Sequence, residues 1–134
     1  MAVLQETRCS TNEKEQLWAH EWPGPSLWSQ TPTPNTGGTA ILVNQLSPIT
    51  ITEAHGDANG WLSTVKIRWG DTVWHLINIY APPTDNPKLN AIRQLQACLS
   101  LIDAQEILIA GDFNINLAPA SENHVYDYED ENEN

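Results

Sequence analysis

Polar residues with catalytic potential follow three apolar stretches of this sequence, at the points where those stretches end. They are Gln5 and Glu6, Asn78 and Tyr80, and Asp112 and Asn114. In layered α/β proteins, binding and catalytic sites commonly lie where several strands end at the same edge of a sheet. We therefore expect these side chains to meet at one rim of the fold.

The residue types suit hydrolysis at phosphorus. Glu6 offers a carboxylate oxygen, the ligand type that a hard cation such as Mg²⁺ prefers. Asp112 could orient or deprotonate a water molecule for attack on phosphorus. Gly111 before it would let the backbone turn sharply and approach a ligand. Asn114 and Tyr80 could hydrogen-bond phosphate oxygens without adding negative charge.

Each residue taken alone also has a structural interpretation. Glu6 could be a solvated strand end or a salt-bridge partner, and Tyr80 a core residue with its hydroxyl at the surface. Asp112 and Asn114 could serve the turn itself, because Asp and Asn favour turns for local reasons. The order and spacing of the three groups together favour a site.

The elements that must position these residues follow from the apolar pattern. Strand patterns cover residues 27–29, 39–43, 49–53, 61–69, 72–80 and 106–110. Gly70 and Asp71 are typical of a hairpin turn. Residues 72–80 and 106–110 are apolar at nearly every position, which predicts strands buried on both faces of a layered α/β fold.

Two helices are expected beside these strands. Ser10 and Glu13 have the spacing of a capping box, and the helix that follows should stop near Pro23. The second helix should start at Asn86, with Pro87 at its first position. It carries one apolar stripe, formed by Leu89, Ile92, Leu95, Leu99 and Ile102.

The charge of the chain argues against a simple nucleic-acid-binding module. The net charge is −11, and the last fourteen residues hold six acids and no Lys or Arg. The first 120 residues still carry 11 acids against six bases, a net of −5. Phosphate binding by bulk charge rests on clustered Lys and Arg, whereas an enzyme's bound cation could supply the missing positive charge.

The two cysteines are too few for a disulfide framework or a zinc site, so an intracellular protein is expected. The sequence shows no signal peptide and no membrane-spanning run.

Five motifs, in this order, resemble the endonuclease/exonuclease/phosphatase superfamily, especially the apurinic-like endonuclease domain of LINE-type non-LTR retrotransposons. They are Leu4-Gln5-Glu6-Thr7, Gly37-Gly38-Thr39-Ala40-Ile41-Leu42, Gly60-Trp61-Leu62, Asn78-Ile79-Tyr80-Ala81-Pro82 and Gly111-Asp112-Phe113-Asn114. The resemblance covers residues 2 to about 117.

The resemblance implies a four-layer α/β sandwich of the DNase I-like type. It also implies a divalent cation, Mg²⁺ or Mn²⁺, and hydrolysis of a phosphodiester by an activated water. Glu6 matches the metal-binding glutamate and Tyr80 the tyrosine beside the scissile phosphate. Asp112 matches the aspartate that positions or activates the water, and Asn114 its neighbouring asparagine. In LINE elements the domain nicks DNA in the nucleus, and the 3′-hydroxyl of the nick primes reverse transcription.

The chain departs from the family pattern at both ends. The family begins with a strand that ends in a metal-site asparagine, and this chain starts after it. The family's later Ser-Asp-His segment has no counterpart, because His124 lacks a preceding Asp. We expect an incomplete sandwich at residues 1–117, an acidic disordered tail at residues 118–134, and weak or absent activity.

Two alternatives stay open: a non-catalytic remnant with a binding role, and a phosphatase of the same superfamily. DNA is the expected partner of an active chain, and the sequence does not predict an oligomeric state.

Overall fold

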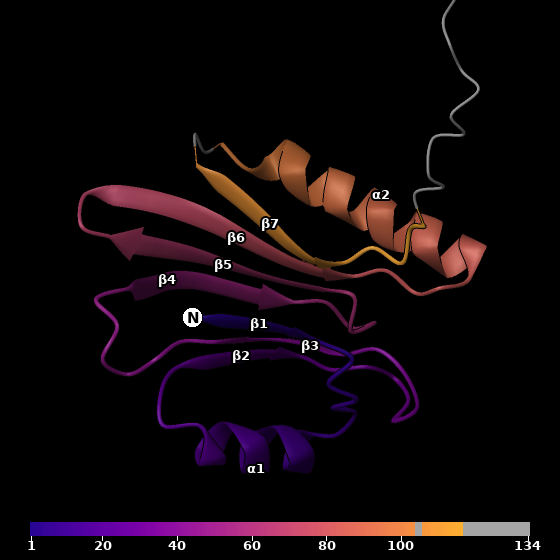
Figure 1. The fold of residues 1–134 in the computed structure, drawn as a ribbon, viewed down its shortest axis with the longest axis horizontal. Coiled ribbons are helices and arrows are strands. Elements are labelled where there is room, and N and C mark those ends of the chain that lie inside the picture. The colour runs from indigo at the N-terminus through magenta and orange to yellow at the C-terminus, as the bar shows by residue number, and fades with distance from the viewer. Residues whose placement is uncertain (104–105, 117–134) are drawn as a thin grey trace, which may run out of the picture.

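The computed structural model describes residues 1–103 and 106–116, which form two β-sheets between two helices (Figure 1). The first sheet has the order β1-β3-β2 and consists of β1 (Ala2–Gln5), β3 (Thr39–Leu42) and β2 (Ser26–Ser29). The second has the order β4-β5-β6-β7 and consists of β4 (Thr50–Gly56), β5 (Leu62–Trp69), β6 (Thr72–Tyr80) and β7 (Ile107–Asp112).

The layers run from α1 (Asn12–Glu21) through the first and second sheets to α2 (Asp85–Leu101) (Figure 1). All strand pairs are antiparallel except β6 and β7, which α2 connects as a parallel pair. The four-layer α/β arrangement expected from the sequence is therefore confirmed.

Strand β6 supplies side chains to two cores because successive residues point to opposite faces. Leu76 packs between the sheets with Ile41 and Val65. Ile77 packs against α2 with Leu95. The expectation of a strand buried on both faces holds for the second half of β6, whereas its first residues are partly exposed.

Both helix starts differ by one or two residues from the sequence prediction. Thr11, not Ser10, caps α1: its Oγ1 accepts a hydrogen bond of 3.2 Å from the Lys14 amide. Helix α2 begins at Asp85, so Pro87 is its third residue rather than its first. A proline is tolerated there because the first-turn amides have no partner inside the helix.

The prediction that residues 106–110 form a strand buried on both faces is wrong. Strand β7 lies at the edge of its sheet within the described part of the chain, and Ile107, Leu108 and Ile109 are 37%, 49% and 38% exposed. An apolar run reveals a strand but not its neighbours in the sheet, so it could not distinguish an inner strand from this edge.

The predicted acidic tail at residues 118–134 and its boundary with the domain lie outside the described residues. In the part of the chain that is described, neither helix is long and apolar enough to cross a membrane.

Candidate functional site

Segments far apart in the sequence meet at one end of the two sheets, where main-chain hydrogen bonds join them. The bonds run from the Arg8 amide to Gly37 O (2.8 Å), Gly38 to Gly60 O (3.0 Å), Tyr80 to Trp61 O (2.7 Å) and Ala81 to Asp112 O (2.8 Å). We call the region formed by residues 6–8, 36–38, 60–61, 80–81 and 112–114 the rim. It brings together all five motifs noted in the sequence.

Asn78 holds the two sheets together just below the rim. Its side chain is fully buried, and its amide group donates to Leu4 O at 2.9 Å and Ala40 O at 3.0 Å in the first sheet. Its Oδ1 accepts a 2.7 Å hydrogen bond from Gln5 Nε2. Asn78 thus hydrogen-bonds to the Gln5 side chain and to two backbone carbonyls of the first sheet. These bonds fix the position of β6 relative to β1 and β3.

Gly111 is required by the close approach of β7 to β6. Its φ is +141°, and a Cβ at this position would lie 1.9 Å from the carbonyl oxygen of Ile79. The sequence predicted a glycine that lets the backbone turn toward a ligand. In the structure its lack of a side chain lets β7 pass close to β6 immediately before Asp112.

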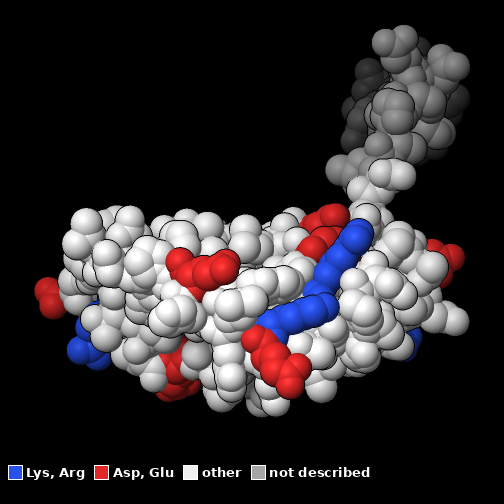
Figure 2. All heavy atoms as spheres, turned by 90° about the horizontal axis from the view of Figure 1, so that it is seen from below, with Lys and Arg blue, Asp and Glu red and all other residues white. Residues whose placement is uncertain are grey.

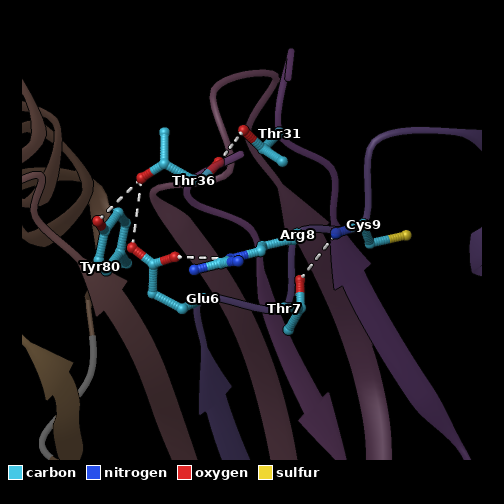
Figure 3. A network of polar contacts seen from close by, with 7 residues as sticks. All are labelled: Glu6, Thr7, Arg8, Cys9, Thr31, Thr36 and Tyr80. Atoms are coloured by element: carbon cyan, nitrogen blue, oxygen red, sulfur yellow. Dashed lines mark hydrogen bonds and ion pairs between the residues drawn. The ribbon is translucent and has the colours of Figure 1, made fainter. Parts of the chain in front are cut away.

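Glu6, Thr36 and Tyr80 form a polar network on the rim (Figure 3). The Thr36 hydroxyl donates to Glu6 Oε1 at 3.3 Å and lies 3.2 Å from the Tyr80 hydroxyl. Each hydroxyl group has one proton, and either Thr36 or Tyr80 could be the donor in the contact between them. The second carboxylate oxygen of Glu6 lies 3.6 Å from Arg8 Nε.

The network favours a charged Glu6 and a neutral Tyr80. Burial raises the pKa of Glu6, but hydrogen bonds from Tyr80, the Gly37 amide, Thr36 and Arg8 outweigh it, so the pKa lies below its usual value. Burial is also the largest cause that raises the pKa of Tyr80, followed by its hydrogen bond to Glu6. The phenol therefore stays a hydrogen-bond donor at neutral pH.

Asp112 and Asn114 lie beside this network. Asp112 is opposite Tyr80 in the register of β6 and β7 and is exposed. Its Oδ1 accepts a 2.8 Å hydrogen bond from the Asn114 amide. Asn114 has a left-handed backbone (φ 47°), and its side-chain amide donates to Ala81 O at 2.7 Å. Both residues thus stabilise the turn, while Asp112 keeps its second carboxylate oxygen available at the surface.

The structure thus brings Glu6, Tyr80, Asp112 and Asn114 to one rim, and it adds two residues that sequence reasoning missed. Thr36 directly precedes the Gly37-Gly38 motif, and Arg8 follows Glu6 by two positions. Their places next to recognised motifs were the available signal, but neither belongs to a strand or a helix.

Two known proteins are similar to this chain. Over 118 residues, 87% of the chain, it is 29% identical to the uncharacterized 149 kDa protein of transposon TX1 from Xenopus laevis. Its structure resembles the crystal structure of a humanized D. rerio TDP2 with 14 mutations, with a TM-score of 0.58 over 85% of the chain and 17% sequence identity. The chain has the DNase I-like fold. No protein-family model matches it.

The sequence similarity to a transposon protein and the DNase I-like fold both fit the resemblance noted in the sequence. The chain spans 9% of the length of the transposon protein and 52% of the TDP2 chain.

The DNase I-like fold of this superfamily is generally metal-dependent. Within residues 1–103 and 106–116, no group of three His, Cys, Asp or Glu side chains could hold a metal ion. Glu6 contributes one carboxylate, whose two oxygens already face Thr36 and Arg8. The donors of the described residues therefore do not fit a cation site by themselves.

A cavity of about 540 Å³ lies away from the rim, near the end of α2, and Glu53, His55, Lys66, His75, Cys98 and Asp103 contribute to its lining. None of the predicted site residues lines it. Its lining mixes acids, imidazoles and an amine, and we assign it no part in the chemistry of the rim.

Proposed function

We propose that this chain carries the hydrolytic rim of a retrotransposon endonuclease, which nicks the phosphodiester backbone of DNA. The observation that supports this proposal best is the meeting of Glu6, Tyr80 and Asp112 on one rim, reached from three strands of two sheets. A carboxylate, a neutral phenol and a second, exposed carboxylate are groups that can serve in hydrolysis at phosphorus.

Each residue has a role that follows from its contacts. Asp112 has one carboxylate oxygen engaged by the Asn114 amide, and the other is available to orient or deprotonate the attacking water. Tyr80 is held neutral, and its single O–H can turn from the network to a phosphate oxygen without repelling it. We assign Asn114 to positioning Asp112, with one amide proton left for the substrate after its bond to Ala81 O.

We further propose that the reaction depends on Mg²⁺ or Mn²⁺ and that Glu6 supplies one ligand. An ionised carboxylate is the form that binds a hard cation, and the lowered pKa of Glu6 favours that form. Within residues 1–103 and 106–116, no group of three His, Cys, Asp or Glu side chains completes the ligand set.

DNA is the proposed substrate and the nucleus the proposed place of action, as for other LINE-type endonucleases. The net negative charge of the chain would repel DNA rather than bind it. On the face that α1 covers, blue side chains lie directly beside red ones and most of the surface is uncharged (Figure 2). Contacts at the rim and a bound cation would have to supply the attraction for phosphate.

The second candidate function is a non-catalytic remnant that binds DNA or phosphate. It is favoured by the two carboxylates of the rim, Glu6 and Asp112, which fall short of the three-residue group that could hold a metal ion within the described part of the chain.

Nicking of supercoiled plasmid separates the two candidates. Purified protein is incubated with Mg²⁺, with EDTA, and as the Asp112→Ala variant, with Asp71→Ala in the β5–β6 turn as the matched control. Cation-dependent nicking that only Asp112→Ala abolishes supports the endonuclease. Folded, soluble protein that does not nick contradicts it and leaves the remnant, whose DNA binding is then measured by fluorescence anisotropy.

The phosphatase alternative is tested with bis(p-nitrophenyl) phosphate and p-nitrophenyl phosphate. We expect hydrolysis of the diester. Hydrolysis of the monoester alone would replace the nuclease assignment with a phosphatase.

A further inference from the structure

Arg8 is held at the rim with most of its hydrogen-bonding capacity unused. Its Nε lies 3.6 Å from Glu6 Oε2, longer than the roughly 2.7–2.9 Å of a charge-assisted hydrogen bond. A guanidinium carries five N–H donors in a planar fork, and the Arg8 side chain is 61% exposed. The long contact with Glu6 therefore leaves N–H donors of the guanidinium able to bind a further acceptor.

The backbone around Arg8 is fixed in an unusual conformation. Glu6 and Arg8 both have left-handed backbones, with φ of 56° and 57°. Such conformations are unfavourable for residues other than glycine and persist where the surroundings enforce them. Here the amides of Thr7 and Arg8 donate to the carbonyls of Gly38 and Gly37, at 3.2 and 2.8 Å.

Packing reinforces this arrangement. A Cβ on Gly38 would lie 2.3 Å from Thr7 Oγ1, so the loop before β3 fits tightly against residues 6–8. The Arg8 side chain extends from this segment toward the Glu6 carboxylate, on whose other side lie Thr36 and Tyr80 (Figure 3). One cation and two hydroxyl groups therefore surround a single carboxylate.

We infer that Arg8 binds a non-bridging phosphate oxygen at the rim, next to the hydroxyl groups of Thr36 and Tyr80. This inference rests on the proposed function for its substrate class, a phosphate ester. A guanidinium matches phosphate geometry with two parallel N–H donors and stays charged at every physiological pH.

Positive side chains are few in this chain, so an Arg at the rim matters for binding an anion. The sequence has six Lys and Arg against 17 Asp and Glu, and Glu6 itself would repel a phosphate. Arg8 offsets that carboxylate at the point where the phosphate oxygen would lie. Exposed ion pairs contribute little to stability, so pairing with Glu6 alone does not explain why the guanidinium of Arg8 is held at the rim.

The test measures binding of simple phosphates by amide NMR at constant ionic strength. Dimethyl phosphate represents the diester and inorganic phosphate the monoester. The variants are Arg8→Gln, which removes the charge, Arg8→Lys, which keeps the charge without the fork, and Arg93→Gln on the exposed face of α2 as the matched control.

We expect saturable chemical-shift changes at the amides of residues 7–8 and 37–38. Phosphate affinity should be at least about tenfold weaker in Arg8→Gln and reduced by an intermediate factor in Arg8→Lys. The affinity of Arg93→Gln should equal that of the original chain. The thermal midpoint of Arg8→Gln should stay within about 3 °C of the original chain. Equal weakening by Arg8→Gln and Arg93→Gln, or no shifts at the rim, would overturn the inference.

The two proposals can fail separately. Arg8-dependent phosphate binding without plasmid nicking keeps the binding role of Arg8 and rejects the nuclease. Nicking that is unaffected by Arg8→Gln keeps the nuclease and rejects the role of Arg8. Preference for dimethyl phosphate over inorganic phosphate indicates a diester substrate, and the reverse indicates a monoester.

Discussion

Tyr80 and Asp112 lie directly opposite each other in the parallel register of β6 and β7. Burial, the hydrogen bond to Glu6 and the charge of Asp112 all raise the pKa of Tyr80, against an opposing contribution from Thr36. The rim thus places a protonated phenol next to a carboxylate, with a main-chain hydrogen bond between Ala81 and Asp112 holding the two strand ends together.

The first prediction concerns the titration of Tyr80. Its pKa should lie above the usual value of 10.0 and should fall in Asp112→Asn, because one of the charges that raise it is removed. Because the folded pKa is raised, the contribution of the neutral phenol to stability is complete below about pH 10 and is lost as the pH rises. NMR of ¹³C-labelled tyrosine follows the titration, with Tyr80→Phe assigning the signal. No difference between the original chain and Asp112→Asn would contradict the arrangement.

The second prediction concerns acid and the Glu6 network. The pKa of Glu6 is lowered, so ionised Glu6 stabilises the fold above its usual pKa of 4.5, and this contribution is lost as the pH falls through the folded value. Glu6→Gln should therefore be less stable than the original chain at pH 7, and the difference should shrink at pH 3.

Urea denaturation of both proteins at the two pH values checks this. The same comparison in a Thr36→Val background serves as the control, and there the pH dependence should be smaller because one hydrogen bond to Glu6 is gone. An equal difference at both pH values would show that the carboxylate is not stabilised by its neighbours.

The third prediction concerns Asn78. Asn78→Ala leaves the carbonyls of Leu4 and Ala40 and the amide of Gln5 without their buried partner. Each such unpaired group costs roughly 1–3 kcal/mol, so we expect a loss of about 3 kcal/mol or more in the free energy of unfolding. Chemical denaturation measures it, with Asn90→Ala on the exposed face of α2 as the control. A loss below about 1 kcal/mol would mean that Asn78 does not join the sheets.

The fourth prediction compares two glycines with positive φ. Gly70 has open space around its Cα, whereas a Cβ on Gly111 would collide with the main chain of Ile79. Gly70→Ala should cost only the roughly 1 kcal/mol of a left-handed backbone, and Gly111→Ala should prevent β7 from pairing with β6. Denaturation curves and amide exchange of β7 compare the two variants. Similar behaviour of both would refute the close approach of the strands.

The fifth prediction concerns the exposed edge strand. Leu108 is 49% exposed and lines an apolar cavity of about 200 Å³ together with Met1, Trp69 and Trp74. Exposed apolar edge strands promote association with other chains, so Leu108→Lys should increase the soluble, monomeric fraction. Light scattering against concentration measures this. Leu101→Lys on α2, 86% exposed in the original chain, is the control and should have a smaller effect.

Local sequence patterns predict much of the fold because they depend on a few neighbouring residues. Alternating residues predict the β5–β6 hairpin, and the structure pairs Leu62 with Ile79 through Trp69 with Thr72. The order of the five motifs predicts the rim, because each motif lies at the end of a strand or in the turn next to one.

The remaining features depend on contacts that the sequence does not display. Asn78 and Tyr80 look alike as polar residues at a strand end, yet Asn78 faces the first sheet and Tyr80 contacts the rim network. Arg8 reaches the network through a left-handed backbone that only the Gly37-Gly38 loop explains. The exposure of β7 depends on which strands pair with it, and a local apolar run does not encode this.

Main-chain hydrogen bonds hold the rim together, so its shape depends less on side-chain identity than its chemistry does. Arg8, Gly38, Tyr80 and Ala81 are joined to neighbouring segments through peptide groups, which every amino acid except proline can supply in full. Substitution of the side chains at these positions therefore leaves the main-chain hydrogen bonds of the rim in place, so its shape can outlast the loss of its reactive groups.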